Sequence, residues 1–253
     1  MTLITRRGLV GSLGIGAGGL LLSGCDRIAA APKVQEVLSL GEGLTMRAQR
    51  LVTDRTALAR EFAASDMSPV FRTNGNTMPG SDAYQTHVMN GFADWQLVVD
   101  GLVHRPQTLS LARIKAMPAR TQITRHDCVE GWSAIGKWTG VPLKLILDGA
   151  GVLPPTRYNV FHCADDFDGT PYYESIDLVD AYHPQTILAW GMNDALLPVG
   201  HGAPLRLRVE RQLGYKQAKF VMRVEAVPSL AGTGGGKGGY WEDSAAYQWY
   251  AGI

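Results

Sequence analysis

The chain has 253 residues, 45% of them hydrophobic, which is enough to bury a sizeable core. It carries 24 lysines and arginines against 23 aspartates and glutamates, a formal net charge of +1 at pH 7. With a net charge this close to zero, the protein has no overall electrostatic attraction for nucleic acid or for an anionic surface. We therefore expect a globular protein with no nucleic-acid partner.

The first 24 residues are typical of an export signal. Arg6 and Arg7 precede a run from Gly8 to Gly24 that contains no charged side chain. The run is too short and too rich in glycine for a membrane-spanning helix, which needs about 20 mostly apolar residues. The paired arginines predict a Tat signal, which carries folded proteins, and a Sec signal is the alternative.

The end of this run resembles the lipobox of bacterial lipoproteins. Small residues in Leu22-Ser23-Gly24 precede Cys25, which would be lipidated as the signal is cut. The sequence therefore predicts a periplasmic protein tethered to the membrane through Cys25. Cleavage by an ordinary signal peptidase near residues 29–31 is the alternative, and it would discard Cys25.

Residues 25–67 are expected to form a tether and an irregular N-terminal segment. Turn-forming residues are dense in the next stretch, 68–79, where Asn74-Gly75 is a tight-turn signal. An asparagine in such a turn usually bonds its own backbone.

Beyond Trp95 the sequence predicts short strands mixed with short helices. The expected elements are two strand pieces within 95–103 that turn at Asp100-Gly101, helices over 110–117, 142–150 and 177–181, and strands over 120–125, 158–163, 186–190, 205–209 and 220–227. The last two strands are expected to pair. This mixture indicates an α+β domain rather than repeated βαβ units.

Cys128 follows the strand expected over 120–125 and has a His, an Asp, a Glu and two Trp nearby in the sequence. A thiol in polar surroundings at a strand end is a candidate nucleophile or metal ligand, and both roles need the thiolate. A disulfide with Cys163 is the structural alternative. A hydrolase that pairs Cys128 with His126 is disfavoured, because the two side chains are expected on opposite faces of the strand.

Basic residues gather near the end of the domain. Arg206, Arg208, Arg211, Lys216 and Lys219 lie within fourteen residues that contain one acidic residue. The first two are expected on one face of a half-buried strand, either as a solvated face or as a phosphate site.

These motifs together resemble the sulfite oxidase superfamily of molybdopterin-dependent oxidoreductases. They are RHDCVEGWS at 125–133, WTGVPL at 138–143 and the stretch from His183 to Lys219. The similarity covers about residues 68–228 and is strongest to the bacterial exported branch, which includes the catalytic subunit of periplasmic methionine sulfoxide reductase. It implies a sulfite-oxidase-type molybdopterin-binding fold, α+β with mixed sheets and short helices, over residues 68–228.

The resemblance also implies roles for single residues. Cys128 corresponds to the thiolate that binds molybdenum, and Glu130 to a catalytic group beside the metal. The residues implied to bind molybdenum-molybdopterin are Asn74, Cys128, Cys163, His201, Arg206 and Lys219. Of these, Arg206 and Lys219 would hold the phosphate, whereas Cys163 and His201 replace a Thr and an Asn of a related enzyme.

The residues after Cys128 argue against sulfite as the substrate. Sulfite oxidases carry a Gly-Asn-Arg stretch there, whereas this chain has Val129-Glu130-Gly131-Trp132, and a carboxylate would repel the anion. We therefore expect oxygen-atom transfer on a small-molecule or protein-bound S-oxide or N-oxide. The sequence has no Cys-x-x-Cys-His haem motif and no cytochrome b5 domain, so a separate haem or other redox protein is the expected electron partner. The alternative is a lipid-anchored, non-catalytic binding or scaffold protein that keeps the fold.

The last segment, 229–253, is rich in glycine and then in aromatic residues. Lys237 is followed by Gly238 rather than by Ser or Thr, so the glycine run does not match a phosphate-binding P-loop. The aromatic residues Trp241, Tyr247, Trp249 and Tyr250 are expected to pack on the domain or to line the approach to the metal.

Overall fold

The computed structural model describes residues 31–54 and 56–253. The chain divides at Val52 into an N-terminal unit and a larger unit from Thr53 to Ile253. The expected export signal and its Cys25 lie outside the described residues, so their assignment stays a prediction. Within the described ranges, no helix is both long enough and apolar enough to cross a membrane.

The N-terminal unit contains a helix where the sequence analysis expected irregular chain. Helix α2 runs from Pro32 to Val52, so the prediction of an irregular tether over residues 25–67 is wrong for these 21 residues. Proline is well tolerated in the first turn of a helix. Helix-forming residues occupy most other positions, and Gly41 and Gly43 each cost only about 1 kcal/mol relative to alanine.

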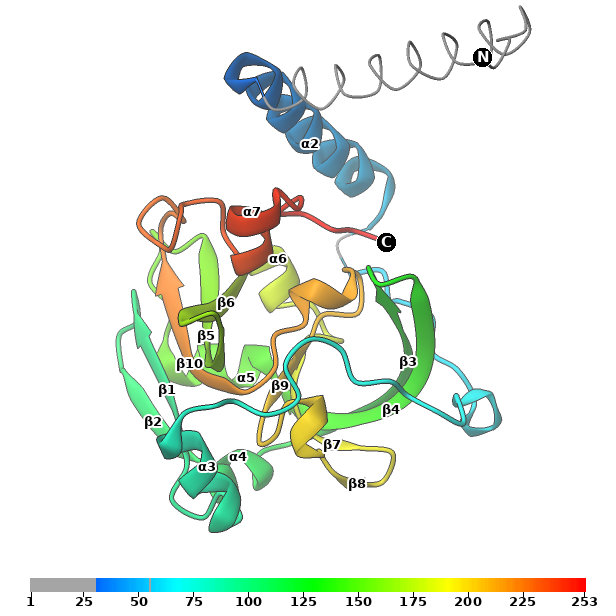
Figure 1. Ribbon diagram of the computed structural model, residues 1–253, viewed down its shortest axis with the longest axis vertical. Coiled ribbons are helices and arrows are strands. Elements are labelled where there is room, and N and C mark those ends of the chain that lie inside the picture. Colours follow the sequence, from blue (N-terminus) through cyan, green and yellow to red (C-terminus); the bar gives the residue numbers. More distant parts are fainter. Residues whose placement is uncertain (1–30, 55) are drawn as a thin grey trace, which may run out of the picture. The chain divides into compact units, whose positions relative to one another are not determined.

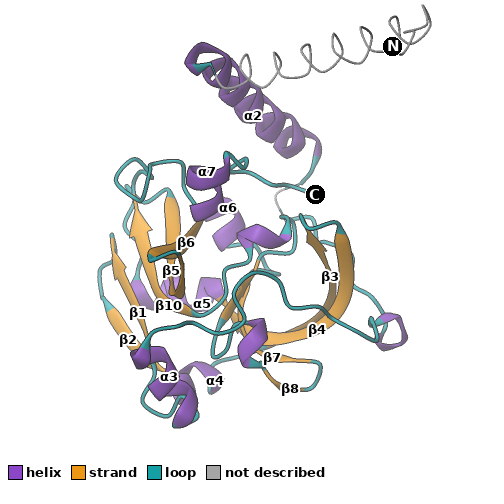
Figure 2. Cartoon of the chain, in the orientation of Figure 1, coloured by secondary structure: helices purple, strands orange, loops and turns teal. Residues whose placement is uncertain are grey.

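Two five-stranded sheets form the larger unit (Figures 1 and 2). The first has the order β2-β1-β10-β5-β6, formed by β2 (Gln107–Ser110), β1 (Gln96–Gly101), β10 (Val221–Val227), β5 (Tyr158–Phe167) and β6 (Thr170–Asp177). Strands β1 and β10 run parallel, and the other neighbours run antiparallel. The parallel pair brings the first and last strands of the unit together.

The second sheet carries the candidate site. Its path is β3-β4-β7-β8, and β9 also pairs with β7; the strands are β3 (Arg120–Cys128), β4 (Trp132–Pro142), β7 (Ile187–Met192), β8 (Ala195–Leu196) and β9 (Arg206–Arg208). All of these pairs are antiparallel. Gly131, with φ of +85°, makes the turn that joins the long strands β3 and β4.

Short helices connect the strands. They are α3 (Asp82–Met89), α4 (Leu111–Lys115), α5 (Leu143–Ala150), α6 (Leu178–Ala181) and α7 (Tyr240–Ala245), with 3-10 turns η1 (Ala64–Asp66), η2 (Val199–His201) and η3 (Gly214–Lys216). Ser110 and Asp177 cap α4 and α6 as expected, and Gly151 ends α5 in the left-handed conformation. The predicted α+β class is confirmed.

One apolar core joins the two sheets. It contains Leu97 and Val224 from the first sheet, Val141 and Leu207 from the second, and Ile146 from α5. Burying each of these side chains contributes roughly 1.5–3 kcal/mol. The core therefore holds β9 and the end of β4 in fixed positions.

The hairpin expected at Asp100-Gly101 is wrong. Strand β1 continues through Gly101 beside β10, and its antiparallel partner β2 begins only at Gln107. Gly101 has φ of +81°, and a Cβ there would lie 2.3 Å from the carbonyl oxygen of Ala226. A glycine is therefore needed at this position because the parallel strands β1 and β10 approach closely there, and not because the chain makes a tight turn.

The pairing predicted for the strand over 205–209 is also wrong. Strand β9 pairs with β7, whereas β10 pairs with β1 and β5. Arg206 and Arg208 are both fully buried, so the expected half-buried strand is wrong, and of the two alternatives for its basic residues the solvated face is excluded. Period-2 spacing places two side chains on one face, but it does not say whether that face meets water.

Candidate functional site

Cys128 is the last residue of β3, and its side chain is buried. Burial raises the pKa of its thiol, a hydrogen bond from the Glu130 backbone opposes this rise, and the smaller effects of the Glu130 carboxylate and the Arg206 charge raise and lower the pKa respectively. The backbone N–H of Gly131 donates to the Cys128 carbonyl over 3.1 Å, closing the turn beyond the thiol. The thiol therefore has a fixed position at the end of a rigid strand.

A cavity of about 220 Å³ opens beside Cys128. One part of its lining is polar and includes Asn74, Asn76, Asp165 and Lys219. Another part is aromatic, formed by Phe167, Tyr172, Tyr215, Trp241 and Tyr247. The cavity thus offers a polar wall and an aromatic wall to a ligand that reaches the thiol.

Lys219 is a buried cation on the polar wall. Its Nζ donates to the carbonyl oxygens of Asn74 over 2.6 Å and of Gly200 over 3.1 Å, and also to the carbonyl of Asn76. Burial, reinforced by the charge of Arg206, lowers the pKa of Lys219 to about 7. No carboxylate pairs directly with this ammonium in the described structure, and its three N–H groups all donate to carbonyls, so it can offer a nearby anion its positive charge rather than a free donor.

Arg206 is a second buried cation near the same site. Its Nη1 donates to the carbonyl of His201 over 3.2 Å, but Nε and Nη2 have no hydrogen-bond partner among the described residues. Burial, reinforced by the charge of Arg208, lowers the pKa of Arg206 to about 9. Buried donors without partners are costly, so this guanidinium is poised to bind an anionic group.

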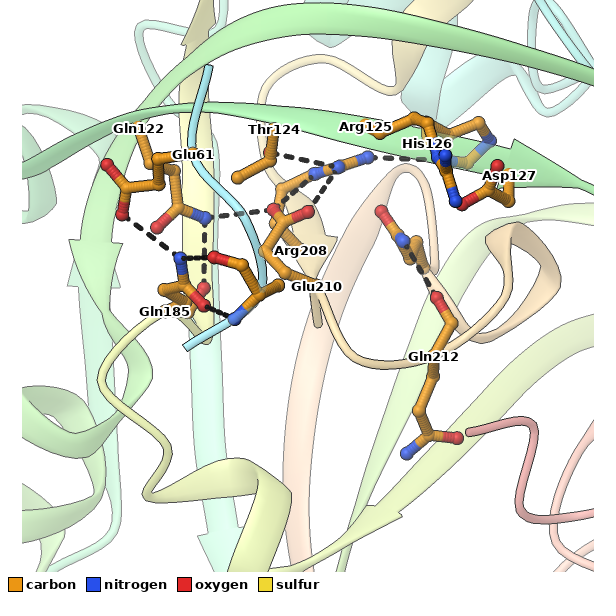
Figure 3. A network of polar contacts seen from close by, with 12 residues as sticks. Glu61, Gln122, Thr124, Arg125, His126, Asp127, Gln185, Arg208, Glu210 and Gln212 are labelled. Atoms are coloured by element: carbon orange, nitrogen blue, oxygen red, sulfur yellow. Dashed lines mark hydrogen bonds and ion pairs between the residues drawn. The ribbon is translucent and has the colours of Figure 1, made fainter. Parts of the chain in front are cut away.

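Arg208, two residues further on, is fully paired. Its Nη2 lies 2.6 Å from Oε2 of Glu210 and its Nε 2.9 Å from Oε1, with all of these side chains buried. Its Nη1 also donates to Nδ1 of His126 over 3.1 Å, and Figure 3 shows the guanidinium between these two partners. Arg208 therefore stabilises the fold, which leaves Arg206 as the arginine available for a ligand.

The structure brings four of the predicted site residues onto one cavity. Asn74, Cys128, Glu130 and Lys219 all contribute to its lining. The Oδ1 atom of Asn74 is buried with no partner in the described parts of the chain. Glu130 is exposed, and its Oε2 accepts a hydrogen bond from the indole of Trp132 over 3.0 Å.

Three predicted residues lie outside the lining of this cavity. They are Cys163, His201 and Arg206. His201 is still close enough for the charges of Arg206 and Lys219 to act on it, although burial is the main reason that its pKa falls to about 4. Its Nδ1 has no partner within the described residues. The cofactor contacts of these three residues stay predictions.

Cys128 forms neither a disulfide with Cys163 nor a hydrogen-bonded pair with His126 in the described structure. Cys128 and Cys163 are both free thiols, so the disulfide is wrong. The argument that His126 and Cys128 point to opposite faces is also wrong, because they are two residues apart and both are buried on the same face of β3. The Nδ1 atom of His126 accepts from Arg208 instead, and no hydrogen bond joins it to Cys128 in the described structure.

Asp165 on β5 is a residue that the sequence analysis missed. It is buried in the cavity lining, its Oδ1 has no partner among the residues described, and Asn76 donates to its Oδ2 over 3.3 Å. Burial raises the pKa of Asp165 to about 6. The only signal in the sequence was a pair of aspartates at 165–166, after the strand predicted over 158–163.

These features fit the cofactor that the resemblance implies. A molybdenum-molybdopterin group needs a soft thiolate for the metal and cations for its phosphate. Cys128 would supply the thiolate, while the unpartnered donors of Arg206 and the ammonium of Lys219 would supply positive charge. Unpartnered acceptors on Asn74 and Asp165 suit the N–H groups of a pterin ring.

Comparison with known proteins agrees with this fit. Residues 84–231 match the family model described as the oxidoreductase molybdopterin binding domain, and the chain belongs to this family of molybdopterin-binding oxidoreductases. The fold is similar to the crystal structure of the sulfane dehydrogenase SoxCD from Paracoccus pantotrophus, with a TM-score of 0.50 and 23% identity over 54% of this chain and 39% of that chain.

A curated relative is more similar in sequence. The provisionally named protein-methionine-sulfoxide reductase subunit YedZ1 of Azospira oryzae is 42% identical over 160 residues, which are 63% of this chain and 56% of the relative. The chain thus spans little more than half the length of this curated relative.

Proposed function

We propose that this protein is an exported molybdopterin-dependent enzyme that removes the oxygen atom from S-oxide or N-oxide substrates, most directly from oxidised methionine. The observation that carries the proposal is a buried thiol, Cys128, in a cavity with the cation Lys219 and close to the unpartnered cation Arg206. The relative's name, a methionine sulfoxide reductase subunit, supports the choice of substrate.

Each residue of the site would have its own role in this reaction. Cys128 would hold the metal, and Arg206 with Lys219 would hold the phosphate of the pterin. When bound, the molybdenum cofactor supplies two-electron oxygen-atom transfer. The aromatic wall would exclude water from the cavity, and the exposed Glu130 can pass protons between solvent and the cavity at its carboxylate oxygens.

The overall reaction fixes what the partner must provide. Conversion of an S-oxide to a thioether and water consumes two electrons and two protons. We therefore propose a separate redox protein, haem-containing or of another kind, as the electron donor, and the word subunit in the relative's name supports such a partner. Export through Arg6 and Arg7 and a lipid anchor at Cys25 would place the enzyme at the membrane on the periplasmic side.

The proposal is tested on protein purified after export. We expect about one molybdenum and one pterin per chain, measured by elemental analysis and by the fluorescence of the oxidised pterin, and reduction of S-oxides with a reduced dye as electron donor. Fully loaded protein that reduces none of a panel of S-oxides and N-oxides would refute the oxygen-removal activity. Protein without molybdenum would favour the non-catalytic scaffold.

The proposed membrane anchor at Cys25 can be tested separately. Cys25→Ala is expected to yield an active enzyme in the soluble fraction, because two acyl chains at about 0.8 kcal/mol per CH₂ are the proposed anchor. It should accept electrons from a dye but work less well with its membrane-bound donor. A variant that still fractionates with membranes would refute the lipid anchor.

A further inference from the structure

The C-terminal segment supplies part of the cavity although it lies beyond the family domain. The family match ends at residue 231, yet Trp241 and Tyr247 line the same cavity as Cys128. The shared domain therefore provides the thiol and the cations, whereas a separate stretch of this chain provides aromatic surface. An aromatic surface that lies outside the shared domain, but beside the thiol of that domain, is a candidate for selecting the substrate.

The aromatic residues form a continuous wall. The rings of Trp241 and Tyr247 are stacked, with centroids 6.0 Å apart and planes 28° apart. Phe167 lies against Trp241 at 5.1 Å, and Tyr215 lies edge-on to Tyr247 at 5.0 Å. Each ring is thus held by another ring of the wall, so the wall presents a fixed apolar surface.

Buried polar contacts fasten this segment to the domain. Nζ of Lys216 lies 2.6 Å from Oε1 of Glu242, the neighbour of Trp241, and both side chains are buried. The hydroxyl of Tyr173 on β6 donates to the carboxylate of Asp243, and the indole N–H of Trp249 donates to Oγ of Ser175 on the same strand over 2.9 Å. The aromatic wall is therefore positioned before any ligand arrives, which reduces the cost of ordering it on binding.

The two walls of the cavity differ in chemistry. Lys219, Asp165 and Asn74 on the polar wall match a charged, hydrogen-bonding group, which is the cofactor in the proposed function. The aromatic wall contributes no cation, so it offers nothing to a small oxyanion such as sulfite. The methyl and methylene groups of an S-oxide are apolar, and burying each of them against aromatic rings contributes about 0.8 kcal/mol.

We infer that Trp241 and Tyr247 are specificity residues that receive the methylthioalkyl arm of an S-oxide substrate, such as an oxidised methionine side chain in a peptide. This inference rests on the proposed function and adds the group that the enzyme recognises. The aromatic wall would hold the methyl and methylene groups next to Cys128, while the S-oxide oxygen turns toward the polar side of the cavity.

The experiment compares Trp241→Ala, Trp241→Phe and Tyr247→Ala with the unaltered protein, all as loaded holoenzyme. Steady-state kinetics use two substrates, a peptide that contains methionine S-oxide and dimethyl sulfoxide, with a reduced dye as donor. For both alanine variants we expect KM for the peptide to rise about three- to ten-fold, with a smaller change for dimethyl sulfoxide and with kcat changed less than KM. Trp241→Phe should recover most of the loss, because it keeps an aromatic face.

Trp249→Phe is the matched control in the same segment. Trp249 packs on Tyr158 at 5.4 Å and donates to Oγ of Ser175 over 2.9 Å, away from the cavity lining. It should leave KM for the peptide unchanged, whereas an equal rise in KM would mean that loosening of the segment, not loss of a substrate contact, explains the effect.

Metal and pterin content separates the remaining outcomes. Normal content with a raised KM supports the inference, and a loss of pterin in both alanine variants would assign the aromatic wall to the cofactor and overturn it. Unchanged KM in active variants would overturn the inference and leave the proposed function standing. An unaltered enzyme that reduces no S-oxide would refute the proposed function and the inference together.

Discussion

Lys216 and Glu242 form an ion pair inside the domain, with Nζ and Oε1 2.6 Å apart and both side chains buried. A second buried carboxylate, Glu174, also contacts the same Nζ. Burial raises the pKa of Glu174 well above its usual value, and Glu242 raises it further while Lys216 opposes the rise. One cation thus holds two carboxyl groups, and η3, β6 and α7 meet at this cluster.

Removal of the shared cation should destabilise the protein. We expect Lys216→Met to lower the free energy of unfolding by roughly 3–5 kcal/mol, because it leaves buried carboxyl groups without their partner. Urea denaturation measures the change. Lys144→Met is the control, since Lys144 and Asp148 form an exposed pair at 2.5 Å and such pairs contribute about 0–1 kcal/mol. Equal effects in the two variants would contradict the importance of the buried cluster.

Cys128→Ser should fold and lose activity. A hydroxyl has nearly the shape of the thiol, so the buried strand end should keep its structure, but it is a poor ligand for a metal that prefers a soft thiolate. We expect an unchanged circular dichroism spectrum and at least a hundred-fold loss of S-oxide reduction, on the order of the effect of removing one essential group. Cys163→Ser, at the other free thiol, is the comparison. Full turnover by Cys128→Ser would refute the role of Cys128 as metal ligand.

Substitution of Arg206 should reduce cofactor binding, whereas substitution of Arg208 should reduce the stability of the fold. Arg206→Met removes a buried cation whose Nε and Nη2 lack partners in the described structure, so the cofactor-free protein should be as stable as before or more stable. Its cofactor retention should fall about ten-fold or more, because charge-assisted phosphate contacts are worth about 1.5–3 kcal/mol each.

Arg208→Met is expected to lower the free energy of unfolding by roughly 3–5 kcal/mol, because Glu210 loses its buried partner. Thermal unfolding of the cofactor-free variants and molybdenum content of the loaded ones measure both effects. Normal metal content in Arg206→Met would mean that this arginine does not bind the cofactor.

The stability of the cofactor-free protein should rise with pH above neutrality. The pKa of Lys219 is about 7 in the folded protein and about 10.4 in an unfolded chain. Between these values the unfolded chain binds more protons, so the free energy of unfolding increases with pH across this window. Urea titrations from pH 7 to 10 should show the increase, and Lys219→Met should remove most of it. The same slope in the variant would assign the effect to another group.

Local signals in the sequence predicted the capped helices. Asp177 and Gly151 are a cap and a stop that act within one turn, and both lie where the sequence placed them. Long-range pairing was not predicted, as strand β4 shows. Gly136 and Gly140 reduce its strand propensity, yet a Cβ at Gly140 would lie 2.3 Å from the carbonyl oxygen of Leu188. That glycine is required by a strand that follows almost fifty residues later in the chain.

The candidate site also contains residues that could be predicted from the sequence and residues that could not. The family resemblance implied that Cys128 and Lys219 share a site, and both residues do line one cavity. The sequence did not predict that Arg206 is buried with Nε and Nη2 unpartnered among the described residues, because this depends on how β9 packs between other elements. Asp165 was missed for a similar reason, since an aspartate next to a strand looks the same in sequence whether it faces solvent or a cavity.

The contact between Lys216 and Glu242 also sets an order of events during synthesis. Glu242 follows every strand of both sheets in the chain, so the sheets can pair while Lys216 still lacks one of its two partners. Because a protein chain emerges from the ribosome N-terminus first, Trp241 and Tyr247 are the last residues of the cavity lining to be made. A nascent chain halted before residue 241 would thus present the cavity without the aromatic surface that Trp241 and Tyr247 supply.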